Sequence, residues 1–244
     1  MLKYGYQILG GYMLGLNIDK SKFVEAVRDG LMRTQEEIYA SGTLTSNRVH
    51  MQKWDYIATS LKNYFSSDAR FIFIPLDRGL FKPVMIFDVE SKTLYTIMKE
   101  QNFNNLTDRK SVVKSHYIDA LLDYNYGYQT EPLQIDIFDY PNLFSTNAKH
   151  QINDLKIKIE SLLKVDDINK YITIVVDFTG FALSDVKAVL CSKWLNIIAS
   201  ESWADYITPS YEEIEVLSEE EEYVQESNIK DKISIGSKIK REHA

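Results

Sequence analysis

The stretch Tyr171 to Phe178, which reads YITIVVDF, constrains the fold of this chain more than any other segment. Isoleucine, valine and threonine are branched at Cβ and favour extended backbone. An almost unbroken apolar run of this length is typical of a strand that is buried on both faces. The chain is therefore expected to contain a sheet with this strand in its interior. With 244 residues, 45% of them hydrophobic, it can bury a sizeable core without disulfides, and Cys191 is its only cysteine.

Other segments show either the spacing of a helix face or the alternation of a strand. From Asp19 to Ala40 apolar residues recur every three or four positions, Asp19 or Ser21 can cap the start, and Ser41-Gly42 ends the pattern. The predicted helices are residues 19–40, 49–65, 112–124 and 147–163. The predicted strands are residues 70–75, 84–87, 94–97, 133–138 and 171–178, and residues 4–18 are interpreted as a strand or hairpin with its turn at Gly10-Gly11.

The segment Leu183 to Ile198 fits two structures. Leu183, Val186, Leu190, Trp194 and Ile197 share one face of a helix, whereas the alternation around Val186 and a turn near Ser192-Lys193 fit a hairpin. We favour the hairpin, because no capping residues fit both ends of a helix here.

The order of these elements predicts an α+β fold, in which an N-terminal helical hairpin packs with a mainly antiparallel sheet and further helices. Residues 1–66 form the helical part and residues 67–210 the α+β core. Residues 211–244 begin with an acidic stretch, Glu219 to Glu222 included, and are expected to be a mobile tail.

Charge and composition make several classes of function less favourable. The net charge is −7, from 35 acidic and 28 basic residues, which disfavours extensive binding to a nucleic-acid backbone. The apolar residues 4–18 are too few for a membrane span and lack a signal-peptide cleavage site, so no membrane partner is expected. The single cysteine fits a reducing compartment.

The spacing Asp88-x-Glu90-x-Lys92 has two interpretations. In a restriction-type nuclease, a Glu-x-Lys in a strand interior and an Asp from the preceding strand hold a metal ion, and Asp77 or Asp88 would supply that Asp here. However, the three charged residues lie between two apolar runs of similar length, where a hairpin turn prefers such residues. We favour the turn.

The remaining chemistry is sparse, and no catalytic residue, metal or cofactor is predicted. The four histidines are dispersed, and neither a nucleophile elbow nor a Walker A loop occurs. Asp177 at a strand end is interpreted as a turn residue at Thr179-Gly180, His116 as an ordinary helix residue, and Cys191 as a small buried apolar residue.

Two groups of residues are candidates for binding. Tyr124, Tyr126 and Tyr128 in YNYGY form either a rigid contact surface or a strand or turn packed on the core. Arg70, Arg78 and Lys82 form either a small anion site or part of a polar loop.

The run Arg70 to Phe103 joins an apolar strand, an Arg-Gly loop, a strand ending in Phe-Asp, and the segment Met98-Lys99-Glu100. With His116-Tyr117 and Trp203-x-x-Tyr206-Ile207 further on, it resembles an uncharacterised family of low-GC Gram-positive bacteria and their phages. The resemblance brings no known activity. It implies a cytoplasmic protein with a link to mobile elements.

We therefore expect a non-enzymatic protein–protein interaction or regulatory protein, such as an accessory factor of a mobile element or of phage–host conflict, with a protein as its partner. The alternative is a metal-dependent nuclease that uses Asp77, Asp88, Glu90 and Lys92. A third hypothesis is a sensor of a small ligand that uses Arg70, Arg78 and Lys82.

Overall fold

The computed structural model describes residues 7–8, 11–12, 14–42, 48–77, 82–108, 116–128, 146–164 and 167–208. The chain splits into two compact units, Met1–Ile207 and Thr208–Ala244, and the fold described below is that of the first. The predicted strand at 133–138 and the predicted tail at 211–244 lie outside the described residues.

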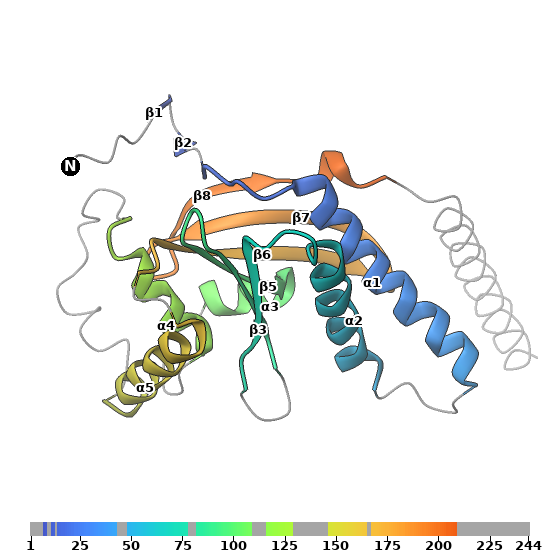
Figure 1. The fold of residues 1–244 in the computed structure, drawn as a ribbon, viewed down its shortest axis with the longest axis horizontal. Coiled ribbons are helices and arrows are strands. Elements are labelled where there is room, and N and C mark those ends of the chain that lie inside the picture. The colour runs from blue at the N-terminus through green and yellow to red at the C-terminus, as the bar shows by residue number, and fades with distance from the viewer. Residues whose placement is uncertain are drawn as a thin grey trace, which may run out of the picture. The chain divides into compact units, whose positions relative to one another are not determined.

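The centre of the first unit is a six-stranded sheet with its strands in chain order from edge to edge (Figure 1). Neighbouring strands are antiparallel except for the central pair β5–β6, which is parallel. The mainly antiparallel sheet and the α+β class are thus confirmed. The strands are β3 (Phe71–Pro75), β4 (Val84–Asp88), β5 (Thr93–Lys99), β6 (Lys170–Thr179), β7 (Ala182–Cys191) and β8 (Ile197–Ser202).

The helices predicted at residues 19–40, 49–65 and 147–163 are confirmed, whereas the helix at residues 100–107 was not predicted. The helices are α1 (Lys20–Ser41), α2 (Val49–Tyr64), α3 (Glu100–Thr107), α4 (Tyr117–Leu121) and α5 (Thr146–Leu163), with 3₁₀ turns η1 (Leu122–Asn125) and η2 (Ala204–Tyr206). Asp19 caps α1 by accepting a hydrogen bond from the Lys22 backbone, and Gly42 ends α1 in the left-handed conformation, as predicted.

Two predictions need correction. The helix expected at 112–124 is an α-helix only over Tyr117–Leu121 in the described residues, and the chain then tightens into η1. The hairpin interpretation of residues 4–18 is confirmed by the antiparallel pair β1 (Gln7–Ile8) and β2 (Gly11–Tyr12), but Gly11, predicted in the turn, is the first residue of β2 and pairs with Ile8.

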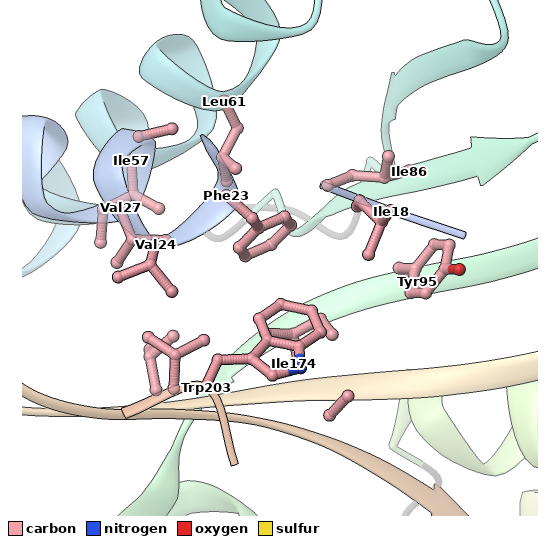
Figure 2. Close-up of a cluster of buried hydrophobic side chains, with 14 of the residues drawn as sticks. Ile18, Phe23, Val24, Val27, Ile57, Leu61, Ile86, Tyr95, Ile174 and Trp203 are labelled. Carbon is pink, nitrogen blue, oxygen red and sulfur yellow. The ribbon is translucent and has the colours of Figure 1, made fainter. Parts of the chain in front are cut away.

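The two faces of the sheet support two separate cores. On one face α1 and α2 cover the sheet, and residues of alternate positions in β4 to β7 point toward them. Figure 2 shows this core, where Phe23 of α1 meets Trp203 edge-on with ring centroids 5.4 Å apart. On the other face α3, α4 and α5 cover the remaining positions. Figure 1 shows α1 and α2 on one side of the central strands and α4 and α5 on the other.

The two cores explain the apolar run of β6. Residues 171–176 of β6 are all buried, because helices cover both faces of the sheet at its centre. The predicted hairpin at Leu183 to Ile198 is also confirmed, with β7 and β8 antiparallel and the chain reversing between Ser192 and Asn196. In the described part of the chain, no helix is long and apolar enough to span a membrane.

Candidate functional site

Asp88 closes the turn between β4 and β5. Its side chain is buried, and its carboxylate accepts hydrogen bonds from the backbone of Glu90 at 3.0 Å, the backbone of Ser91 at 3.4 Å and the Ser91 hydroxyl at 2.7 Å. An aspartate that bonds to the backbone two and three residues ahead stabilises a tight turn. The hairpin-turn interpretation of this segment is therefore confirmed.

The charged residues of this turn bind different partners. The Arg70 guanidinium lies 3.5 Å from Asp68, 3.8 Å from Asp88 and 3.5 Å from Glu90. Lys92 instead pairs with Asp167 at 2.7 Å. Glu90 and Lys92 thus do not act on a common site in the way that the nuclease alternative requires.

Asp77 lies at the opposite end of the β3–β4 hairpin, where Lys82 approaches it at 3.9 Å. The four steps from Val84 to Asp88 separate the two ends by roughly 13 Å. The nuclease alternative predicted one cluster from these residues, and the structure does not assemble it. Across the described ranges, no group of three or more His, Cys, Asp or Glu side chains is placed to hold a metal ion.

The same separation disperses the predicted anion site. Arg70 is occupied by carboxylates at one end of β3, and Lys82 lies beside Asp77 at the other. Arg78 lies outside the described residues. The described members of this group therefore do not form one patch.

The three tyrosines of YNYGY lie in and just after η1, and each has a different environment. Tyr124 packs on the core under α4 and α5 and donates to Glu160 at 3.3 Å, whereas Tyr128 packs on the core under α1 and α2. Tyr126 is 66% exposed, with the Lys193 amine 5.6 Å from its ring centroid. They are not a single contact surface, because the 3₁₀ turn directs successive side chains to different sides.

Asp177, His116 and Cys191 have structural roles. Asp177 accepts a hydrogen bond from the Ser184 hydroxyl at 2.8 Å, across the β6–β7 hairpin that turns at Gly180. His116 is the N-cap of α4, where its Nδ1 accepts from the Ile118 backbone and its own backbone donates to Asp119 at 2.7 Å. Cys191 is buried, as predicted.

A cleft of about 430 Å³ opens where β5 ends, and we call it the β5 cleft. Glu100 begins α3 directly after Lys99, so the chain leaves the sheet here and leaves space between α2, α3 and the start of α4. Its lining is mainly apolar. The lining residues are His50, Met51, Trp54, Ile97, Met98, Lys99, Asn102, Asn105, Leu106, His116 and Tyr117.

Two lysines give one edge of the β5 cleft a positive charge. The Lys99 amine lies 4.6 Å from the ring centroid of Phe178, and the Lys53 amine lies 5.3 Å from the same centroid. Lys53 also donates to the Gly180 carbonyl at 2.6 Å and lies 4.2 Å from the Phe181 ring. Burial, and then repulsion by Lys99, lower the pKa of Lys53 below its usual value.

Only a partial signal for this cleft is present in the sequence. None of the predicted binding residues lines it. Met98-Lys99 and His116-Tyr117, however, both belong to the segments that carry the resemblance to an uncharacterised family. Trp54 and Lys53 come from a predicted helix that no motif singled out.

Comparison with known proteins places these segments in one family. A family of unknown function, DUF5986, matches residues 17–244. The chain belongs to this family. The match includes every residue that lines the β5 cleft, as well as both lysines at its edge. Neither the curated proteins nor the solved structures gave a match. DUF5986 membership confirms the expectation of an uncharacterised family.

Proposed function

We propose that this protein is a non-enzymatic interaction protein with a regulatory role, and that the β5 cleft holds a side chain of its protein partner. The observation that carries the proposal is the cleft itself, which is open, mainly apolar and about 430 Å³ in volume. That size lies within the range of natural ligand sites and suits a large apolar anchor residue.

Met51 supports a role in contact with a partner. It is 45% exposed although it lines an apolar cleft. Methionine is flexible and polarizable, and exposed methionines adapt to the shape of a bound side chain. Trp54, which packs edge-on against Phe178 with centroids 6.1 Å apart, offers a fixed aromatic wall beside it. A flexible residue next to a rigid aromatic one is a suitable receptor for an apolar anchor.

The residues present at the end of β5 also favour binding over metal-dependent catalysis. A strand-interior Glu-x-Lys would need a carboxylate two residues before its lysine, and the residue two before Lys99 is Ile97. Val84 of the preceding strand β4 lines the same small pocket as Ile97. The position that would supply the second metal-binding carboxylate is therefore apolar as well. No observation favours the nuclease alternative, and we do not propose it.

The biological setting of the proposal rests on the resemblance of residues 70–103. On that basis we propose that the protein is an accessory factor of a mobile element or of phage–host conflict. A protein that blocks or recruits a partner needs a specific surface rather than an active site, and the β5 cleft supplies one.

A displayed library of random peptides, selected on the immobilised full chain, tests the proposal. Asn102→Trp places a large side chain in the cleft, and Asn104→Trp is the matched control, because Asn104 is exposed on the same helix but does not line the cleft. Selected peptides should bind the wild type and Asn104→Trp with equal Kd and lose roughly tenfold or more in affinity for Asn102→Trp.

Circular dichroism and thermal melting would establish that both tryptophan variants are folded. Failure to select any peptide, or peptides that bind Asn102→Trp as well as the wild type, would contradict a partner site in the β5 cleft.

A further inference from the structure

We propose that the partner segment held in the β5 cleft is acidic, with an Asp or Glu next to its apolar anchor, and that this carboxylate binds between Lys53 and Lys99. The inference rests on the proposed function and specifies the chemistry of the partner. Four observations on the described residues support it.

The first observation is that two ammonium groups lie near the same aromatic ring. Lys53 comes from α2 and Lys99 from the end of β5, and both amines lie within 5.3 Å of the centroid of Phe178. Burial, and then repulsion by Lys99, lower the pKa of Lys53. A carboxylate placed between two such groups removes this repulsion and gains two charge-assisted contacts.

The second observation concerns the missing counter-ions. Among the described residues, neither Lys53 nor Lys99 has a carboxylate partner, although the chain has more acidic than basic residues. The nearby acids have other partners: Glu100 binds Lys187 at 2.5 Å, and Asp177 binds Ser184.

The third observation is that Lys53 is already held in place. Its amine donates to the Gly180 carbonyl at 2.6 Å and lies against the rings of Phe178 and Phe181. A side chain that is fixed before binding loses little conformational entropy when the anion arrives. Lys53 is therefore preorganised for an anion rather than extended freely into solvent.

The fourth observation is the position of Lys99, which itself lines the apolar cleft. A partner residue that fills the cleft thus brings its sequence neighbours beside the Lys99 amine. Successive residues of an extended chain are about 3.3 Å apart along its axis, so the carboxylate belongs within one or two positions of the anchor.

The same geometry favours a protein segment over a nucleic acid. A pair of lysines suits one carboxylate, whereas nucleic-acid binding at physiological salt takes several contacts to successive phosphates. The cleft beside them is lined by apolar residues such as Met51, Ile97 and Leu106, which match an apolar side chain better than a base edge.

The experiment uses the peptides selected on the wild-type chain. They should be enriched in Asp or Glu within two positions of a large apolar residue. Lys53→Gln and Lys99→Gln should each weaken their binding roughly tenfold, because a hydrogen bond to a charged group is lost. Lys62→Gln, an exposed lysine near the end of the same helix as Lys53, is the control and should leave Kd unchanged.

The dependence of peptide affinity on salt concentration is a second measurement. It would not change if the two lysines had only a structural role. Affinity should fall as sodium chloride rises, and the double variant Lys53→Gln/Lys99→Gln should lose most of this dependence. Peptides whose binding is weakened by Asn102→Trp but by neither lysine substitution would support the β5 cleft as a partner site. They would overturn the inference that the partner segment is acidic.

Nucleic acid is tested directly with a labelled single-stranded oligonucleotide and a labelled duplex. Neither probe should bind the full chain in a way that depends on Lys53 and Lys99. Lysine-dependent binding of either probe, without selection of acidic peptides, would overturn the inference in favour of a phosphate ligand.

Discussion

The side-chain amide of Asn125 pairs with the backbone of Tyr171 as a neighbouring strand would. Its Oδ1 accepts from the Tyr171 N–H at 2.7 Å, and its Nδ2 donates to the carbonyls of Tyr171 at 2.8 Å and Cys191 at 2.9 Å. The β6–β7 register, continued beyond its pair Thr173–Val189, would place Tyr171 opposite Cys191. The buried Asn125 amide therefore bridges the point where these two strands separate.

We predict that Asn125→Ala strongly destabilises the protein. It leaves three buried backbone groups without their partner, at a cost of about 1–3 kcal/mol each, so the free energy of unfolding should fall by at least about 3 kcal/mol. Urea denaturation followed by circular dichroism measures this loss. Asn104→Ala, at an exposed position of α3, is the control, and a comparable effect of both substitutions would contradict the role of the amide.

The two acidic residues of the β4–β5 turn should differ sharply. Asp88 is buried and bonds to three groups of the turn, so Asp88→Ala should lower the free energy of unfolding by about 2–4 kcal/mol. The Glu90 side chain is 65% exposed, and Glu90→Ala should change it by less than about 1 kcal/mol. Chemical denaturation of the two variants compares them, and equal losses would argue against the structural role of Asp88.

Gly30 is expected to tolerate no side chain. A Cβ at this position would lie 2.5 Å from the Cα and 2.7 Å from the nitrogen of Ile57, so α1 and α2 would have to move apart. Gly30→Ala should therefore destabilise the fold by about 1–3 kcal/mol or more, although alanine favours a helix by about 1 kcal/mol.

Gly127→Ala is the matched control for this close approach, because nothing lies within 4 Å of a Cβ built there. Thermal melting of both variants checks the prediction. A melting temperature for Gly30→Ala at or above that of the wild type would show that the helices can separate without cost.

The Cys191 thiol should be unreactive in the folded protein. Burial leaves it 2% exposed and raises its pKa to about 12, so the reactive thiolate is scarce at pH 8. A disulfide reagent that reports on free thiols should modify the native chain very slowly, yet modify one thiol per chain in denaturant. Rapid, complete modification under native conditions would mean that the strand end at Cys191 opens easily.

Local pattern in the sequence was enough to predict most of the elements. The spacing from Asp19 to Ala40 gave α1 and its caps, and the apolar run Tyr171–Phe178 gave β6 with both faces buried. The charged residues at 90–92 were correctly placed in a turn. Each of these features depends on neighbours within a few residues, because side-chain periodicity and backbone preference are local properties.

The candidate site could not be predicted in the same way. The β5 cleft joins Trp54, Lys99 and His116 from three separate segments, and no local pattern states that these meet. The sequence left the tyrosines of YNYGY as either one contact surface or a turn packed on the core, and the structure shows Tyr124 and Tyr128 packed on opposite cores. Arg70 was a candidate for an anion site or a polar loop, and in the structure Asp68 and the β4–β5 turn supply it with carboxylates.

By itself, the sequence thus determined α1, α2, α5, the strands β3 to β7 and the turn at Asp88, because these follow from short-range spacing and burial of apolar faces. Only the tertiary structure decided that β5 and β6 run parallel, that Asn125 bridges β6 and β7, and that Lys53 and Lys99 meet at one ring. These are contacts between segments far apart in the chain. Their free energy depends on distances, burial and neighbouring charges, which are set only when the chain folds.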